Sequence, residues 1–188
     1  MCMKVKKMFL GVMAALLLTT APAPALAAGG NQMIDSTVES ITPRKKDHTD
    51  ALLKVQTTKI LSKITNSKMT RAQKLKACWK YMVDGRKFRY GGVDPNMKEE
   101  GWQRKAALSM LRTKRGNCIH FACAFAALAE EIGYKNIKLK MSKTHCWMTI
   151  NDKHYDPQKQ YTGKITGVYG LKKYPKNYRK IKTYDYMG

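Results

Sequence analysis

The most apolar stretch in the middle of the chain covers residues 118–132 and reads CIHFACAFAALAEEI. No charged residue interrupts it before Glu130, so it has almost no polar face to turn towards water. A helix that is apolar all round is buried all round. Gly116 before it and Gly133 after it are natural breaks. The pattern therefore predicts a buried central helix over 118–132.

Three earlier segments carry apolar residues at helical spacing among lysines and other polar residues. They cover about 49–64, 70–85 and 100–112. Thr70 is a favourable N-cap for the second segment, and Gly85 is a suitable stop. Gly91 and Gly92 are turn signals, so the stretch between the second and third segments is expected to be a loop. We therefore expect three amphipathic helices before the buried one.

After the central helix the period changes from that of a helix to that of a strand. Polar residues alternate with apolar ones at Ile137, Leu139 and Met141. Two further strands are expected over 145–150 and 153–156, joined by an Asn-Asp turn. Helices followed by an antiparallel sheet indicate an α+β fold with the buried helix packed on the sheet. This domain is expected over 49–188, after a polar, flexible lead-in over 28–48.

Residues 1–27 have the layout of a secretory signal peptide. Three lysines precede an apolar run from Met8 to Leu18, and an A-x-A pattern predicts cleavage after Ala27, with Ala28 as the alternative. A run of about 11 residues is too short to span a bilayer, so we expect no transmembrane segment in the mature chain. The protein is expected to be secreted, extracellular or associated with the cell wall.

The charge of the chain is strongly basic. Removal of the first 27 residues takes away three lysines and lowers the formal net charge from +23 to +20. Such a charge fits an anionic cell wall, a membrane surface or nucleic acid. Anionic envelope polymers are the most available of these outside a bacterial cell, and no nucleic-acid partner is expected. The alternative is that the lysines only keep the protein soluble.

The tail from residue 161 to 188 holds six of the ten tyrosines and seven lysines or arginines. Aromatic residues interleaved with basic ones can follow a polyanion or stack on sugars or bases. We favour a simpler interpretation, in which the tyrosines close the edge of the sheet with their hydroxyls in water.

Four cysteines remain after the predicted cleavage: Cys78, Cys118, Cys123 and Cys146. An exported protein can form disulfides, but Cys118 and Cys123 diverge on one helix and the cysteines have apolar neighbours. Buried free thiols are therefore expected for all but Cys118. The spacings are not those of a zinc site, and no metal or cofactor is expected. A site formed by Cys118, His120, His145 and Cys146 is disfavoured because strand alternation separates the last two.

Cys118 lies at the start of the predicted central helix. A helix N-terminus carries a partial positive charge and free N–H groups, which stabilise a thiolate. The N–H of Cys118 is also placed to donate to an oxyanion. The alternative is a small buried core residue, as we expect for Cys123.

His145 is at the head of the second strand, and Asp156 ends the third. Strand alternation predicts that His145 shares a face with Trp147, whereas Cys146 is turned towards the core. A hairpin of this length brings Asp156 near His145, where a carboxylate can orient the imidazole. Asp156 has the alternative role of a turn residue before Pro157. The other histidines lie in the lead-in, on the central helix or in a turn: His48, His120 and His154.

The segments GNCIHFACAFAALAEEIG, THCWMTI and YDPQ, taken in order, resemble the core of the transglutaminase-like superfamily. The upstream segment KLKACWKYMVDGRKFRYGG is similar to the helix and tyrosine-bearing loop that precede the nucleophile in that family, so the likeness covers about 57–161. It implies a papain-like α+β fold with Cys118 as nucleophile, His145 as base and Asp156 as acid.

The chain is too short for the calcium-binding and β-barrel domains of animal transglutaminases, and it has no acidic cluster suited to calcium. The resemblance therefore implies a compact bacterial-type member. The second oxyanion donor is unassigned, with Tyr90 and Trp102 as candidates.

We expect a secreted, thiol-dependent acyl-transfer enzyme, a transglutaminase-like acyltransferase, cysteine peptidase or amidase. Its substrate would be a protein or peptide, with cell-wall peptide as one candidate, and the outcome would be hydrolysis or cross-linking. The alternative is a non-catalytic module of the same fold that binds the cell wall or another polyanion.

Overall fold

The computed structural model describes residues 48–163 and 168–187. The predicted signal peptide, and the lead-in apart from His48, lie outside the described residues. The helices of the described part are α1 (Thr49–Ile64), α2 (Arg71–Met82), α3 (Trp102–Thr113), α4 (Cys118–Glu131) and α5 (Pro157–Tyr161). The strands are β1 (Arg89–Tyr90), β2 (Arg115–Gly116), β3 (Ile137–Met141), β4 (Cys146–Ile150), β5 (Lys153–Tyr155), β6 (Tyr169–Leu171) and β7 (Lys182–Asp185).

The four expected helices are present, and their ends follow from local chemistry. Thr70 caps α2 with a capping box, in which its hydroxyl accepts from the N–H of Gln73 and the Gln73 side chain accepts from the N–H of Thr70. Helix α3 ends at Thr113, and the C-cap residue Lys114 adopts a left-handed conformation with φ 59°.

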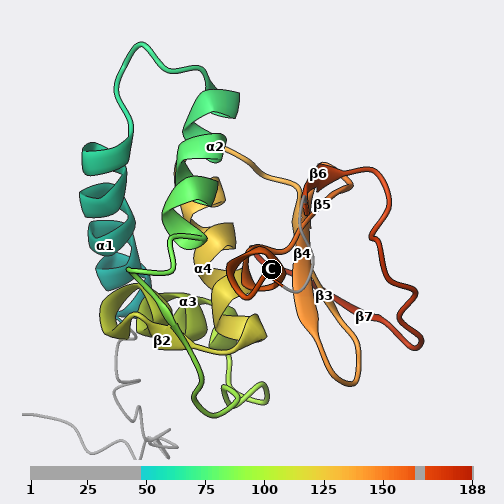
Figure 1. Cartoon of the computed structure of the whole chain (residues 1–188). Coiled ribbons are helices and arrows are strands. Elements are labelled where there is room, and N and C mark those ends of the chain that lie inside the picture. Colours follow the sequence, from blue (N-terminus) through green and yellow to red (C-terminus); the bar gives the residue numbers. More distant parts are fainter. Residues whose placement is uncertain (1–47, 164–167, 188) are drawn as a thin grey trace, which may run out of the picture. The chain divides into compact units, whose positions relative to one another are not determined.

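Helix α4 lies at the centre of the fold, between the other helices and the sheet (Figure 1). Every residue from Ile119 to Ala129 is buried, which confirms the prediction from the apolar pattern. Five of these residues are alanines, and their small side chains let α3 and β4 approach the helix closely.

The sheet is antiparallel, with the strand order β6-β5-β4-β3-β7. Central strand β4 is buried on both faces. Cys146, Met148 and Ile150 join the main core with α4, whereas Trp147 packs in a second cluster with Val168 and Tyr174. The chain is therefore an α+β domain with the buried helix packed on an antiparallel sheet, as the sequence predicts.

The tail contributes both edge strands of this sheet, β6 against β5 and β7 against β3. The expected closure of the sheet edge by the tail is confirmed, but the expected exposure of the tyrosine hydroxyls is wrong for at least three residues. The hydroxyl of Tyr161 donates to the backbone carbonyl of Phe88 at 2.6 Å. The hydroxyl of Tyr174 donates a hydrogen bond to buried Asp156, and the hydroxyl of Tyr186 is buried without a partner in the described part of the chain.

Two further elements differ from the sequence prediction. The stretch expected to be a loop contains β1, which pairs in parallel with β2 just before α4. A short helix, α5, follows Asp156 where the pattern predicts only a turn. Strand β1 depends on pairing with a segment distant in sequence, and α5 depends on a single capping side chain. Hydrophobic periodicity detects neither.

Candidate active site

The start of α4 is held by its N-cap residue, Asn117. The Asn117 side-chain oxygen accepts from the N–H of Ile119 at 3.1 Å and lies 2.8 Å from Nδ1 of His120. Its amide donates to Oδ1 of Asp94 at 2.5 Å. Cys118 occupies the first position of the helix, and its N–H has no hydrogen-bond partner among residues 48–163 and 168–187. This N–H is therefore available to a substrate oxygen.

Backbone packing behind Cys118 requires a glycine. A Cβ atom at Gly116 would lie 2.4 Å from Cβ of His120 and 2.8 Å from the sulfur of Met110. No side chain fits in that space, and so the chain can pass behind the helix start only with glycine at this position.

His145 is the last residue of the loop between β3 and β4, one position before the strand begins. Its backbone is fixed by Ser142, whose hydroxyl accepts from the N–H of His145 at 3.1 Å and whose N–H donates to the carbonyl of His145 at 2.8 Å. The side chain is only 6% exposed. The imidazole is thus held by a rigid hairpin rather than by a free loop.

Asp156 is fully buried and uses both carboxylate oxygens. Oδ2 lies 2.6 Å from Nε2 of His145, and the hydroxyl of Tyr174 donates to the same oxygen. Oδ1 accepts from the N–H of Lys159 at 2.9 Å and so caps α5. Asp156 therefore both caps the helix that begins at Pro157 and contacts the histidine.

The three residues singled out in the sequence lie together in the structure. Nε2 of His145 is engaged by Asp156, which leaves Nδ1 for the Cys118 side of the ring. Burial of His145 acts to lower its pKa, but hydrogen bonds to Asp156 and Cys118 and the negative charges of both outweigh it, so the pKa is raised. A raised pKa favours an imidazolium beside the thiol.

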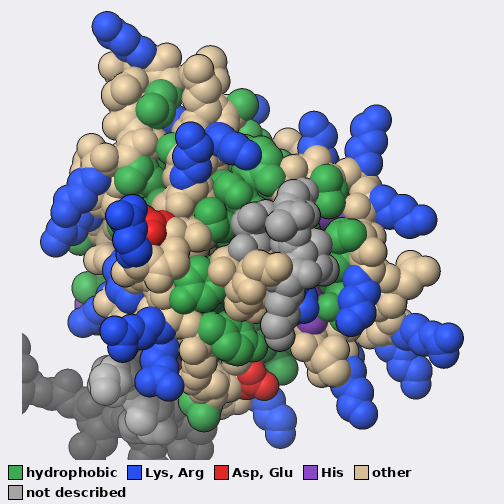
Figure 2. All heavy atoms as spheres, in the orientation of Figure 1, with side chains coloured by type: hydrophobic (Ala, Val, Ile, Leu, Met, Phe, Trp, Pro, Cys, Tyr) green, Lys and Arg blue, Asp and Glu red, His purple; other side chains and the backbone are tan. Residues whose placement is uncertain are grey.

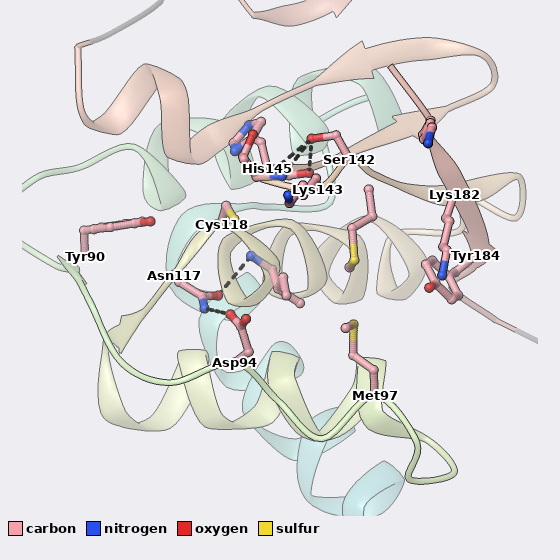
Figure 3. Close-up of a pocket in the computed structure, with 14 residues that line it drawn as sticks. Tyr90, Asp94, Met97, Asn117, Cys118, Ser142, Lys143, His145, Lys182 and Tyr184 are labelled. Carbon is pink, nitrogen blue, oxygen red and sulfur yellow. Dashed lines mark hydrogen bonds between the residues drawn. The ribbon is translucent and has the colours of Figure 1, made fainter. Parts of the chain in front are cut away.

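Cys118 and His145 face a cleft of about 500 Å³ between the helix start and the sheet. Figure 3 shows Tyr90 at one end of this cleft and Lys182 and Tyr184 at the other, with Cys118 between them. The cleft is also bordered by the 90–97 loop, the start of α4, the β3–β4 hairpin and the segment before β7. The residues that line it there are Asp94, Met97, Asn117, Ile119, Met141, Ser142, Lys143, Thr144 and Lys180.

A protein-family model described as the transglutaminase-like superfamily matches residues 58–155. The match covers just over half of the chain, and it includes Cys118 and His145 and ends one residue before Asp156. The chain belongs to the transglutaminase-like superfamily. Members of this superfamily share a papain-like fold and are generally cysteine-dependent enzymes. Searches of curated proteins and of solved structures found no match.

The two oxyanion candidates differ in position within this transglutaminase-like domain. Tyr90 lines the cleft, is 52% exposed, and is brought beside the start of α4 by the pairing of β1 with Gly116. Burial, with the negative charges of Cys118 and Asp94, raises the pKa of Tyr90, so its hydroxyl stays protonated. Trp102 is a buried core residue whose ring packs edge-on against Tyr184, and it does not line the cleft.

An aromatic wall behind His145 was missed by the sequence analysis. Trp147 stacks on Tyr174 with ring centroids 4.4 Å apart and on Tyr178 at 5.2 Å. Tyr178 also lies against the His145 ring, at 5.7 Å. Both tyrosines come from the tail, beyond the matched family region. The density of tyrosine in the tail was the available signal, but it does not tell which tyrosine folds back onto the site.

The remaining cysteines and histidines lie away from the cleft. Cys78, Cys123 and Cys146 are buried free thiols, as expected. Burial raises the pKa of Cys78 to about 12 and raises those of Cys123 and Cys146 as well. Within the described ranges, no group of three or more His, Cys, Asp or Glu side chains is placed to hold a metal ion. None of the described helices is long and apolar enough to cross a membrane.

Proposed function

We propose that this protein is a thiol-dependent acyl-transfer enzyme in which Cys118 is the nucleophile, His145 the general base and acid, and Asp156 the residue that orients the imidazole. The observation that carries the proposal is the buried His145, which contacts Asp156 through Nε2 and lines the same cleft as Cys118. A carboxylate on Nε2 fixes the tautomer and stabilises the imidazolium formed when the thiol loses its proton.

In the proposed reaction the sulfur of Cys118 bonds to the carbonyl carbon of an amide, and the thiol proton resides on His145. The N–H of Cys118 donates to the resulting oxyanion, and the protonated hydroxyl of Tyr90 is the candidate for a second donor. Collapse of this intermediate breaks the C–N bond. His145 returns its proton to the leaving nitrogen, and a thioester remains on Cys118.

The thioester is then resolved by water or by an amine. His145 takes a proton from the attacking molecule, and the C–S bond breaks to restore the thiol. Water completes hydrolysis, whereas a primary amine completes a cross-link. The half-exposed end of the cleft at Tyr90 admits either acceptor, so the proposal covers both outcomes.

We also propose that the enzyme is exported and acts at the anionic cell envelope. The N-terminal pattern and the formal charge of +23 support this. Lysine and arginine side chains are spread over the face shown in Figure 2, with few acidic side chains among them. If binding of the mature protein to isolated cell walls were insensitive to salt between low and physiological ionic strength, the charge would not be the cause of binding.

The test of the catalytic proposal is the rate of iodoacetamide labelling as a function of pH, followed by mass spectrometry on the mature protein. Rapid labelling of Cys118 at mildly acidic pH, lost in His145→Ala, supports a Cys–His ion pair. Turnover is then measured with glutaminyl peptides and hydroxylamine, which converts a thioester to a hydroxamate. If Cys118 were labelled no faster than Cys78, the catalytic proposal would be wrong and a non-catalytic binding module would be the remaining interpretation.

A further inference from the structure

The lining of the cleft is asymmetric in charge. Three lysines border it: Lys143 from the β3–β4 hairpin, Lys180 from the segment before β7, and Lys182, the first residue of β7. Within residues 48–163 and 168–187, none of the three forms an ion pair. The one acidic residue of the lining, Asp94, is bonded to Asn117 on the helix side. The sheet side of the cleft is therefore positively charged and without an internal counter-ion.

The position of Lys182 within the sheet directs it into the cleft. Lys182 pairs with Met141, and two residues later Tyr184 pairs with Leu139, so the side chains of Lys182 and Tyr184 share the face of the sheet that packs on the helices. Tyr184 packs against Trp102 on that face. Lys182, on the same face, is exposed and lies at the end of the cleft away from Tyr90 (Figure 3).

The register also sets the distance of Lys182 from the strand position that follows His145. Lys182 pairs with Met141, and Met141 pairs with Cys146, the residue after His145. Two strand spacings of about 4.8 Å put Lys182 roughly 10 Å from Cys146 across the sheet. His145 precedes Cys146, and an extended peptide advances about 3.3 Å per residue, so a group bound at Lys182 would be two or three residues from an amide held beside His145.

We propose that this side of the cleft is a subsite for the carboxylate of an acidic peptide substrate. The acidic residue would lie two or three positions from the amide that reacts. This inference rests on the proposed acyl-transfer function and specifies its substrate class. Apolar side chains in the same lining favour a peptide over a phosphate polymer. Ile119, Met97 and Met141 offer contact to the aliphatic stem of a glutamate, which polyphosphate lacks.

The subsite can be tested with short peptides that carry an electrophile for Cys118. One series has an N-terminal chloroacetyl group, and a second has a C-terminal chloromethyl ketone, so that residues on either side of the reacting group are sampled. In each, the residue two or three positions away is glutamate, glutamine or lysine. The sulfur displaces chloride and forms a C–S bond, and the second-order rate at Cys118 is read by mass spectrometry.

We expect the glutamate peptide of one series to react about three- to tenfold faster than its glutamine counterpart at low salt. The preference should decline as ionic strength rises, because exposed charges are screened. It should disappear in a triple variant in which Lys143, Lys180 and Lys182 are replaced by glutamine. A matched variant with Lys63, Lys68 and Lys80 replaced by glutamine loses the same charge at exposed positions outside the cleft, and it should keep the preference.

A charge-reversal variant with Lys143→Glu, Lys180→Glu and Lys182→Glu supplies a test that loss of packing cannot imitate, because it should reverse the order and favour the lysine peptide. Equal rates for glutamate and glutamine peptides in both series, with rapid reaction of Cys118 towards iodoacetamide, would overturn the subsite and leave the acyl-transfer proposal standing. Slow reaction of Cys118 with iodoacetamide would overturn both the subsite and the acyl-transfer proposal. If inorganic polyphosphate competed more strongly than tri-glutamate, the subsite would bind a phosphate polymer and the acidic-peptide proposal would be wrong.

If Lys182 only protects the edge of the sheet from pairing with other chains, its replacement would promote association and leave the peptide preference unchanged. Size-exclusion chromatography of Lys182→Gln beside the labelling experiment separates the two roles. An unchanged preference in that variant and in the triple variant would overturn the subsite.

Discussion

The hydroxyl of Tyr174 donates a hydrogen bond to Oδ2 of Asp156, the same oxygen that lies 2.6 Å from Nε2 of His145. Tyr174 thus holds the carboxylate at the oxygen that also contacts the histidine. It comes from the tail of the chain, 18 residues after Asp156. Its ring stacks on Trp147, so the hydroxyl is presented by a packed aromatic wall.

Replacement of Tyr174 by phenylalanine should lower kcat by roughly three- to tenfold with little change in KM. The ring would still pack on Trp147, but Asp156 would lose one donor and hold His145 less firmly. Steady-state kinetics on the best peptide substrate give both constants. Tyr134→Phe, which removes a hydroxyl near the far end of α4, is the control. An equal fall in both variants would rule out a positioning role for Tyr174.

The raised pKa of His145 predicts a pH-dependent contribution to stability. The charged form is favoured in the folded protein, so the stabilisation is fully present below the ordinary pKa of about 6.5 and is lost as the pH rises through the folded value. Asp156→Asn removes the partner that raises the pKa. The difference in unfolding free energy between wild type and variant should therefore be larger at pH 5.5 than at pH 9, measured by urea denaturation. A difference that grows with pH would contradict this assignment.

Gly116→Ala should destabilise the fold by roughly 1–3 kcal/mol, because the new methyl group would lie 2.4 Å from Cβ of His120. The start of α4 would have to shift, and the labelling rate of Cys118 should fall with it. Gly85→Ala is the matched control, since a Cβ there meets only the ring of Tyr161 at 3.6 Å. Urea denaturation of both variants gives the comparison, and equal stability would show that the backbone adapts at no cost.

Only one thiol of the mature protein should react rapidly in the native state. Cys118 is partly exposed in the cleft, whereas Cys78, Cys123 and Cys146 are buried with raised pKa values. Titration with Ellman's reagent should therefore show one fast thiol without denaturant and four in guanidinium chloride. A second fast thiol in the native protein would mean that the core around α4 opens readily.

Much of the site follows from local sequence. The apolar run after Asn117 specifies a buried helix with Cys118 at its head, because the absence of a polar face leaves the helix no exposed position. Alternation around Trp147 specifies a strand with one side towards the core, and the short Asn-Asp turn brings Asp156 back beside His145. These features depend on residues that are close together in the chain, so they can be predicted from the sequence alone.

The tertiary structure alone decided which distant segments complete the cleft. The edge strands β6 and β7 form by backbone pairing, which any extended segment can make, so no local pattern indicates that β7 lies beside β3. That pairing brings Lys182 to the cleft, and the return of the tail over β4 brings Tyr174 to Asp156. Hydrophobic periodicity indicates which side of a helix or strand is buried. The packing of the whole domain determines which other segment covers that side.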